Sequence, residues 1–206
     1  MKRKGTNDKR QEKGFTIIEM MVAVALFAIV MVISAGALLS LASANRKAQA
    51  LQSVMNNLNT TLDSMVRSMR EGSTYDASRS CAGGNSGGPK DCTGGGTYII
   101  FQPHEYNPPT VLERAYQFVP SAASCGSGYT GGCIKRSLDG GNNWTVVTAP
   151  EISIVDMNFY VVGTTPGDTV QPKVVLEIKG IAGANDSKTK TTFHIQATAV
   201  QRVLDI

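Results

Sequence analysis

The chain has 206 residues, of which 42% are hydrophobic and 17% are charged, and its formal net charge is +4. This length fits one ordinary domain with a tail or an anchor and excludes two large domains. Residues 1–14 contain six basic and two acidic side chains, which give 6 − 2 = +4, so the remaining chain is neutral. A domain that binds nucleic acid through a basic surface is therefore not expected.

The N-terminal part combines a basic leader, residues 1–14, with an apolar segment, residues 15–45. Residues 20–45 carry no charge and exceed the about 20 residues that a membrane-spanning helix needs. Under the positive-inside rule, the leader is a cytoplasmic flank, and the chain beyond the apolar segment lies on the exported side.

The apolar segment contains one charged side chain, Glu19, near its start. A carboxylate at a membrane position is unfavourable by about 2.5 to 3.5 kcal/mol at the bilayer centre and by less near the edge. We therefore expect Glu19 to have a partner. The alternative is an ordinary acid at a helix start, where the helix dipole favours it.

Residues 46–72 are expected to continue the same helix, because no proline occurs between Phe15 and Gly72. This part is polar except for one apolar stripe whose members recur at spacings of four and three residues. We expect the stripe to pack on the protein's own β-sheet, with a partner coiled coil as the alternative. The stripe comprises Leu51, Met55, Leu58, Leu62, Met65 and Met69.

Residues 72–96 are rich in glycine and predict a flexible surface loop. The run GGNSGG within this loop is not expected to bind phosphate, because no strand precedes it and no helix beginning with Lys-Ser or Lys-Thr follows it.

The four cysteines fall into two close pairs on the predicted exported side, where disulfides are permitted. Each pair closes a short loop, and thiols that are close in the sequence meet most readily in the unfolded chain. We therefore predict the disulfides Cys81–Cys92 and Cys125–Cys133. A zinc site of four cysteines is the alternative, although the sequence lacks a C-x-x-C knuckle.

Residues 73–206 are expected to form a globular β domain, because β-branched and aromatic runs alternate with glycine, proline and asparagine clusters. One helix followed by consecutive strands predicts an α+β fold, in which an antiparallel sheet packs on the amphipathic helix. Strand alternation places Val174, Leu176 and Ile178 on one face. The predicted strands are residues 97–101, 115–119, 133–138, 144–148, 152–162, 172–180 and 191–203.

The run SLDGGNNW has the spacing of an Asp-box, a hairpin motif of β-propellers. It predicts a tight turn in which Asp139 caps backbone amides and Trp144 packs beneath them. Since a single copy carries no chemistry, we interpret it as a hairpin, with a calcium site at Asp139 as the alternative. No catalytic set of residues stands out, and no metal site or cofactor is expected.

The stretch KGFTIIE, residues 13–19, joins a basic leader to a glycine, a carboxylate five residues further on and a long apolar helix. It resembles the class III signal of type IV prepilins and of the related pseudopilins of type II secretion. The resemblance implies that a membrane prepilin peptidase cuts between Gly14 and Phe15 and methylates the new amine of Phe15. It also implies that Glu19 faces the N-terminal amine of a neighbouring subunit in a filament.

The resemblance implies a structural subunit of a type IV pilus-like or type II secretion pseudopilus filament, and no enzyme activity. Its partners would be other pilin or pseudopilin subunits, the prepilin peptidase, the inner-membrane assembly platform and the membrane, with no nucleic acid. The chain would cross the cytoplasmic membrane once, N-terminus inside, and then enter an extracellular or periplasmic filament.

Three other functions remain open on the sequence. The first is an extracellular binding domain, an adhesin or receptor, on an uncleaved membrane anchor. The second is an exported hydrolase. The third is a conventional secreted protein, released by cleavage after the Ala-Ser-Ala run at residues 42–44.

Overall fold

The computed structural model describes residues 14–77, 81, 91–165, 170–183 and 190–202. The chain divides into two compact units, Met1–Asn45 and Arg46–Ile206. The predicted leader lies outside the described residues except for Gly14, and so does the GGNSGG run. The predicted α+β fold is confirmed: a long N-terminal helix is followed by antiparallel β-sheets.

The helix α1 (Ile17–Arg70) is uninterrupted, as the absence of proline predicts. It begins after Thr16, whose side-chain oxygen accepts a hydrogen bond from the backbone N–H of Glu19 at 3.3 Å. At the other end, the Tyr75 hydroxyl lies 2.5 Å from the carbonyl oxygen of Met69 and 2.8 Å from that of Gly72. The single O–H of this phenol donates to one of these two carbonyl oxygens, and the Met69 carbonyl also accepts a hydrogen bond from the Gly72 N–H at 3.1 Å. These bonds cap the C-terminal end of the helix.

The first part of α1 is apolar around its whole circumference and exposed. Among the described residues, α1 is the one helix long and apolar enough to cross a membrane, with a mean hydropathy of 2.8 over its most apolar 18 residues, none of them buried. Exposed apolar surface of this extent is typical of a segment that contacts lipid or other protein chains.

The second part of α1 belongs to the globular unit and packs on the sheets through the predicted apolar stripe. Leu58, Met65 and Met69 are about 1% exposed. One member was wrong: Met55 is 42% exposed, and Val54 is buried in its place. Spacings of three and four residues lead from Leu51 to Leu58 through either residue, so only the position of the sheet decides which of them is covered.

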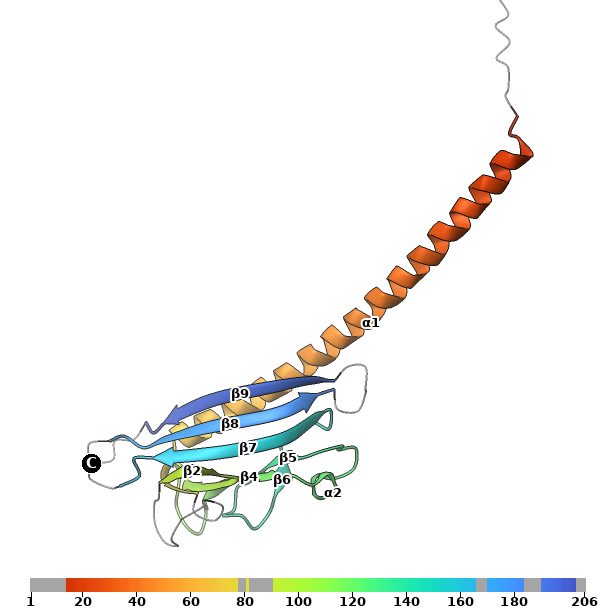
Figure 1. Cartoon of the computed structure of the whole chain (residues 1–206). Helices are drawn as coiled ribbons and strands as arrows, with labels where there is room; N and C mark the ends of the chain where they lie inside the picture. Colours follow the sequence, from red (N-terminus) through yellow and green to blue (C-terminus); the bar gives the residue numbers. More distant parts are fainter. Residues whose placement is uncertain (1–13, 78–80, 82–90, 166–169, 184–189, 203–206) are drawn as a thin grey trace, which may run out of the picture. The chain divides into compact units, whose positions relative to one another are not determined.

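A five-stranded antiparallel sheet has the order β1-β3-β4-β5-β6. A four-stranded antiparallel sheet has the order β2-β7-β8-β9, and Figure 1 shows its long strands β7, β8 and β9 side by side. The first comprises β1 (Ser73–Asp76), β3 (Tyr98–Gln102), β4 (Arg114–Val119), β5 (Cys133–Ser137) and β6 (Thr145–Val146). The second comprises β2 (Cys92–Gly96), β7 (Ile152–Val162), β8 (Lys173–Ala182) and β9 (Thr191–Val200), and a short helix α2 (Ala122–Cys125) follows β4.

The single predicted sheet is therefore divided in two, and both parts share one core with α1. Buried side chains of this core come from α1 and from both sheets, including Leu58, Phe101 and Phe159. The predicted alternation in β8 is confirmed, since Val174, Leu176 and Ile178 are at most 2% exposed.

The predicted loop at residues 72–96 was wrong at both ends, where the structure has β1 and β2. The sequence of β2, CTGGG, is rich in glycine and has low strand propensity, and the sequence of β1, STYD, is only four residues long. They are strands because they pair with β3 and β7, which are long-range contacts that no local pattern records.

Candidate functional site

The peptide bond between Gly14 and Phe15 lies before the first turn of α1, which begins at Ile17. Gly14 is exposed, and no atom lies within 4 Å of the position that a Cβ would take. The Phe15 side chain is 78% exposed. A protease therefore meets exposed, non-helical backbone at Gly14 and Phe15.

Glu19 lies in the first turn of α1, where the Thr16 side chain caps its backbone N–H. Its side chain is exposed, and within the described part of the chain no basic side chain forms an ion pair with it. The neighbouring side chains of Phe15, Ile18 and Met20 are apolar and exposed. The site therefore presents one carboxylate on an exposed hydrophobic surface, and it can pair with a cation that arrives from another molecule.

The family model described as the prokaryotic N-terminal methylation motif matches residues 9–35. The chain carries the signature of type IV pilins and pseudopilins. The matched range contains Gly14, Phe15 and Glu19 and extends well into the apolar part of α1. Families with this signature are structural and not enzymatic. No curated protein and no solved structure matches the chain.

The structure joins the cysteines in two disulfides within the globular unit. Cys81 is bonded to Cys92 with 5.8 Å between their Cα atoms, and Cys125 to Cys133 with 6.0 Å. The first bond lies at the start of β2, and the second ties the end of α2 to the start of β5. Both bonds together use the four sulfur atoms that a zinc site would need.

Removal of one disulfide should destabilise the globular unit without changing its fold. For loops closed over 11 and 8 residues, the chain-entropy model gives each bond about 2 to 3 kcal/mol. The pair Cys125→Ser/Cys133→Ser should therefore lower the free energy of unfolding by about this amount in denaturant titrations.

Peptide mapping without reductant should recover the two native links. A Cys81–Cys125 link, or free thiols in exported protein, contradicts the pairing.

The β5–β6 hairpin confirms the Asp-box prediction. The Asp139 carboxylate accepts hydrogen bonds from the backbone N–H groups of Asn142 at 3.1 Å and Asn143 at 2.8 Å. The Trp144 indole N–H donates to the Gly141 carbonyl at 2.9 Å. The backbone φ of Gly141 is +93°, a conformation that residues with a Cβ rarely adopt. The motif is therefore a structural turn.

These hydrogen bonds lower the pKa of Asp139 to about 2; the backbone N–H of Asn143 contributes most, followed by the Ser137 side chain. Both groups donate a hydrogen bond to the carboxylate and favour this ionised form over the protonated acid. Because the pKa is lower in the folded state, the turn stabilises the fold fully above the unfolded-state pKa of about 3.9. This stabilisation is lost as the pH falls through about 2.

We therefore expect Asp139→Asn to flatten the dependence of unfolding free energy on pH between about 4 and 2. The measurement is a series of denaturant midpoints over this range for both chains. Asp63→Asn, which removes a carboxylate of α1 outside the turn, serves as the matched control for the loss of one carboxylate. An unchanged slope for Asp139→Asn would show that the hydrogen bonds do not favour the charged form.

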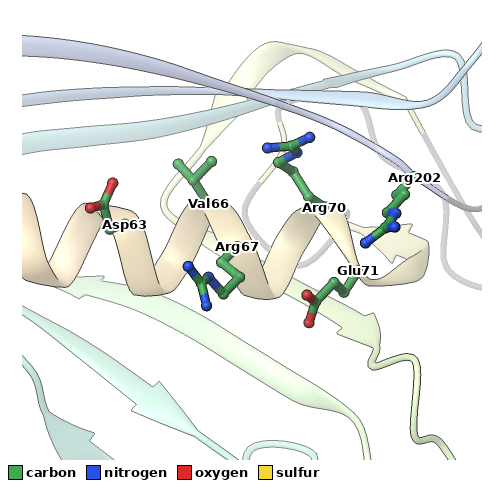
Figure 2. Close-up of a pocket in the computed structure, with 6 residues that line it drawn as sticks. All are labelled: Asp63, Val66, Arg67, Arg70, Glu71 and Arg202. Atoms are coloured by element: carbon green, nitrogen blue, oxygen red, sulfur yellow. The ribbon is translucent and has the colours of Figure 1, made fainter.

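A charged hollow of about 360 Å³ lies at the C-terminal end of α1. Figure 2 shows its side chains, and the backbone N–H of Arg202 donates to the Arg70 carbonyl at 2.8 Å. Its charged side chains are exposed, and within the described residues no two of them approach within 4.0 Å as an ion pair. We interpret this hollow as a solvated surface. It is lined by Asp63, Val66, Arg67, Arg70, Glu71 and Arg202.

Proposed function

We propose that the chain is a structural subunit of a type IV pilus-like or type II secretion pseudopilus filament. The observation that carries this proposal is the methylation signature at residues 9–35, on a helix whose most apolar stretch has no buried residue. A soluble globular protein does not leave such a surface in water, so lipid covers it before assembly and neighbouring subunits cover it afterwards.

The first step of this function is processing. A prepilin peptidase cuts between Gly14 and Phe15 and methylates the amine of Phe15, while the neutral remainder of the chain stays anchored by α1. The N-terminus faces the cytoplasm before assembly, and the globular unit lies on the opposite side of the membrane. The exposed, non-helical backbone at Gly14 supports this step.

The second step is assembly through α1. Glu19 of one subunit pairs with the amine of Phe15 in another copy or in a related pilin, on an inner-membrane assembly platform. Two buried opposite charges are tolerated when they neutralise each other, whereas either charge alone is unfavourable by several kcal/mol. This pairing provides Glu19 with the partner that a carboxylate in apolar surroundings needs.

The test is to determine the N-terminal residue of the protein after its expression together with a prepilin peptidase. Intact mass and N-terminal sequencing should show a chain that begins at N-methylated Phe15. A chain that begins at Asn45 would identify a conventional secreted protein. An uncut chain with the peptidase present would identify a permanently anchored binding domain.

A further inference from the structure

Two arginines occupy positions on the core-facing side of the five-stranded sheet. Residues two apart in a strand share a face, so Arg114 lies on the same face of β4 as the buried Tyr116 and Phe118. Arg136 of β5 is paired with Tyr116 in the antiparallel register and therefore shares this face as well. Such positions usually hold apolar side chains, and a cation at one of them needs an opposite charge or hydrogen-bond acceptors close by.

The chain itself neutralises these two arginines only in part. The Arg114 guanidinium donates to the Ser68 hydroxyl at 3.2 Å and lies 3.9 Å from Glu105, whose side chain is 75% exposed. A separation of 3.9 Å is too long for a charge-assisted hydrogen bond. Among the described residues, no carboxylate lies within 4.0 Å of the half-buried Arg136.

The two guanidinium groups meet at the phenol of Tyr116. Burial raises the pKa of Tyr116, and the Ser68 hydroxyl and the charges of Arg136 and Arg114 act against this rise. Arg114, Arg136, Ser68 and Tyr116 line the same cavity. Two cations and two hydroxyl groups therefore share one small volume.

This volume is a cavity of about 160 Å³ between α1 and strands β4 and β5, which we call the arginine pocket. Arg67 of α1 is a third cation in its wall, and Glu71 is its one acidic side chain. Figure 2 shows Arg67 and Glu71 on the same side of α1. The wall comprises Ser64, Arg67, Ser68, Glu71, Arg114, Tyr116, Arg136 and Leu138.

We propose that the arginine pocket binds an oxyanion group, a phosphate or a carboxylate, between the guanidinium groups of Arg114 and Arg136. The planar fork of a guanidinium donates two parallel hydrogen bonds to such a group, and neighbouring hydroxyl groups supply further donors. The oxyanion comes either from a free ligand or from an acidic side chain of a neighbouring subunit. Binding neutralises Arg136, which has no carboxylate within 4.0 Å among the described residues, and Arg114, whose partner Glu105 lies 3.9 Å away.

The first experiment uses inorganic phosphate as the probe on the full chain in detergent micelles. Phosphate at about ten times its Kd should raise the Tm by about 3 to 5 °C relative to chloride at equal ionic strength. Phosphate also stabilises proteins by exclusion from their surface. The specific effect is therefore the difference between the Tm rise of the wild type and the Tm rise of a variant. Arg136→Gln should lose the specific part of this shift.

Lys135→Gln is the matched control, because Lys135 pairs with Gln117 and lies on the opposite face of β5. Lys135→Gln removes one positive charge next to Arg136 in the chain and should retain the full phosphate-induced rise in Tm. Arg67→Gln, on the exposed side of α1, should reduce the shift and remains informative if Arg136→Gln does not fold. Equal shifts in wild type, Arg136→Gln and Arg67→Gln would overturn the proposal.

A second experiment distinguishes the two sources and rests on the proposed function. Arg136→Gln that is processed normally but enters filaments poorly identifies the carboxylate of a neighbouring subunit as the oxyanion. Arg136→Gln that assembles normally but has lost the phosphate shift identifies a free ligand. A failure of the proposed function itself is separate, because it abolishes processing and filaments in the wild type and leaves the phosphate shift intact.

Discussion

The Gly14→Val chain is expected to remain in the membrane as the longer precursor, with no mature protein detected. Gly14 is exposed, and no atom lies within 4 Å of the position of a new Cβ, so valine causes no clash within this chain. The expected block arises outside the chain, because a β-branched side chain covers the backbone that the peptidase must approach. Intact mass after expression with the peptidase measures the effect.

Gly36→Val is the matched control for this experiment. Gly36 lies within the apolar part of α1 and likewise has no atom within 4 Å of a new Cβ. The same substitution there leaves the predicted cleavage site untouched, so processing should be normal. Mature protein from Gly14→Val in wild-type amounts would refute cleavage at this bond.

The Glu19→Gln chain is expected to be processed but to be excluded from filaments. Glutamine keeps the shape of the side chain and removes its charge, so membrane insertion is not impaired. In the filament, the amine of a neighbouring Phe15 would be buried without its counter-charge. Loss of one side of a buried pair costs roughly 3 to 5 kcal/mol, which is more than about a hundredfold in an equilibrium constant.

The measurement compares sheared filaments with processed subunit that stays in the membrane. Asp63→Asn is the matched control, since it removes a carboxylate from the same helix outside the apolar segment. It should enter filaments as the wild type does. If Glu19→Gln assembles equally well, the proposed ion pair is wrong, and Glu19 is an ordinary acid at a helix start.

The residues of the candidate site lie close together in the sequence. Gly14, Phe15 and Glu19 were named through the family resemblance, which rests on the basic leader, the stretch KGFTIIE and the long apolar helix that follows it. Their roles stay predictions until the experiments above are done. The arginine pocket was missed, although Arg114, Tyr116 and Phe118 alternate in the sequence. That alternation is a signal that the arginine shares a face with core aromatics.

The sequence by itself determined the apolar span, the uninterrupted helix and the Asp139 turn, because these depend on residues within a few positions of one another. Only the tertiary structure decided that β1 and β2 are strands and that Val54 is buried instead of Met55. Only the tertiary structure brings Arg136 of β5 to the surface of α1. The physical reason is that strand pairing and helix covering are contacts between distant segments, and their free energy depends on partners that no local pattern names.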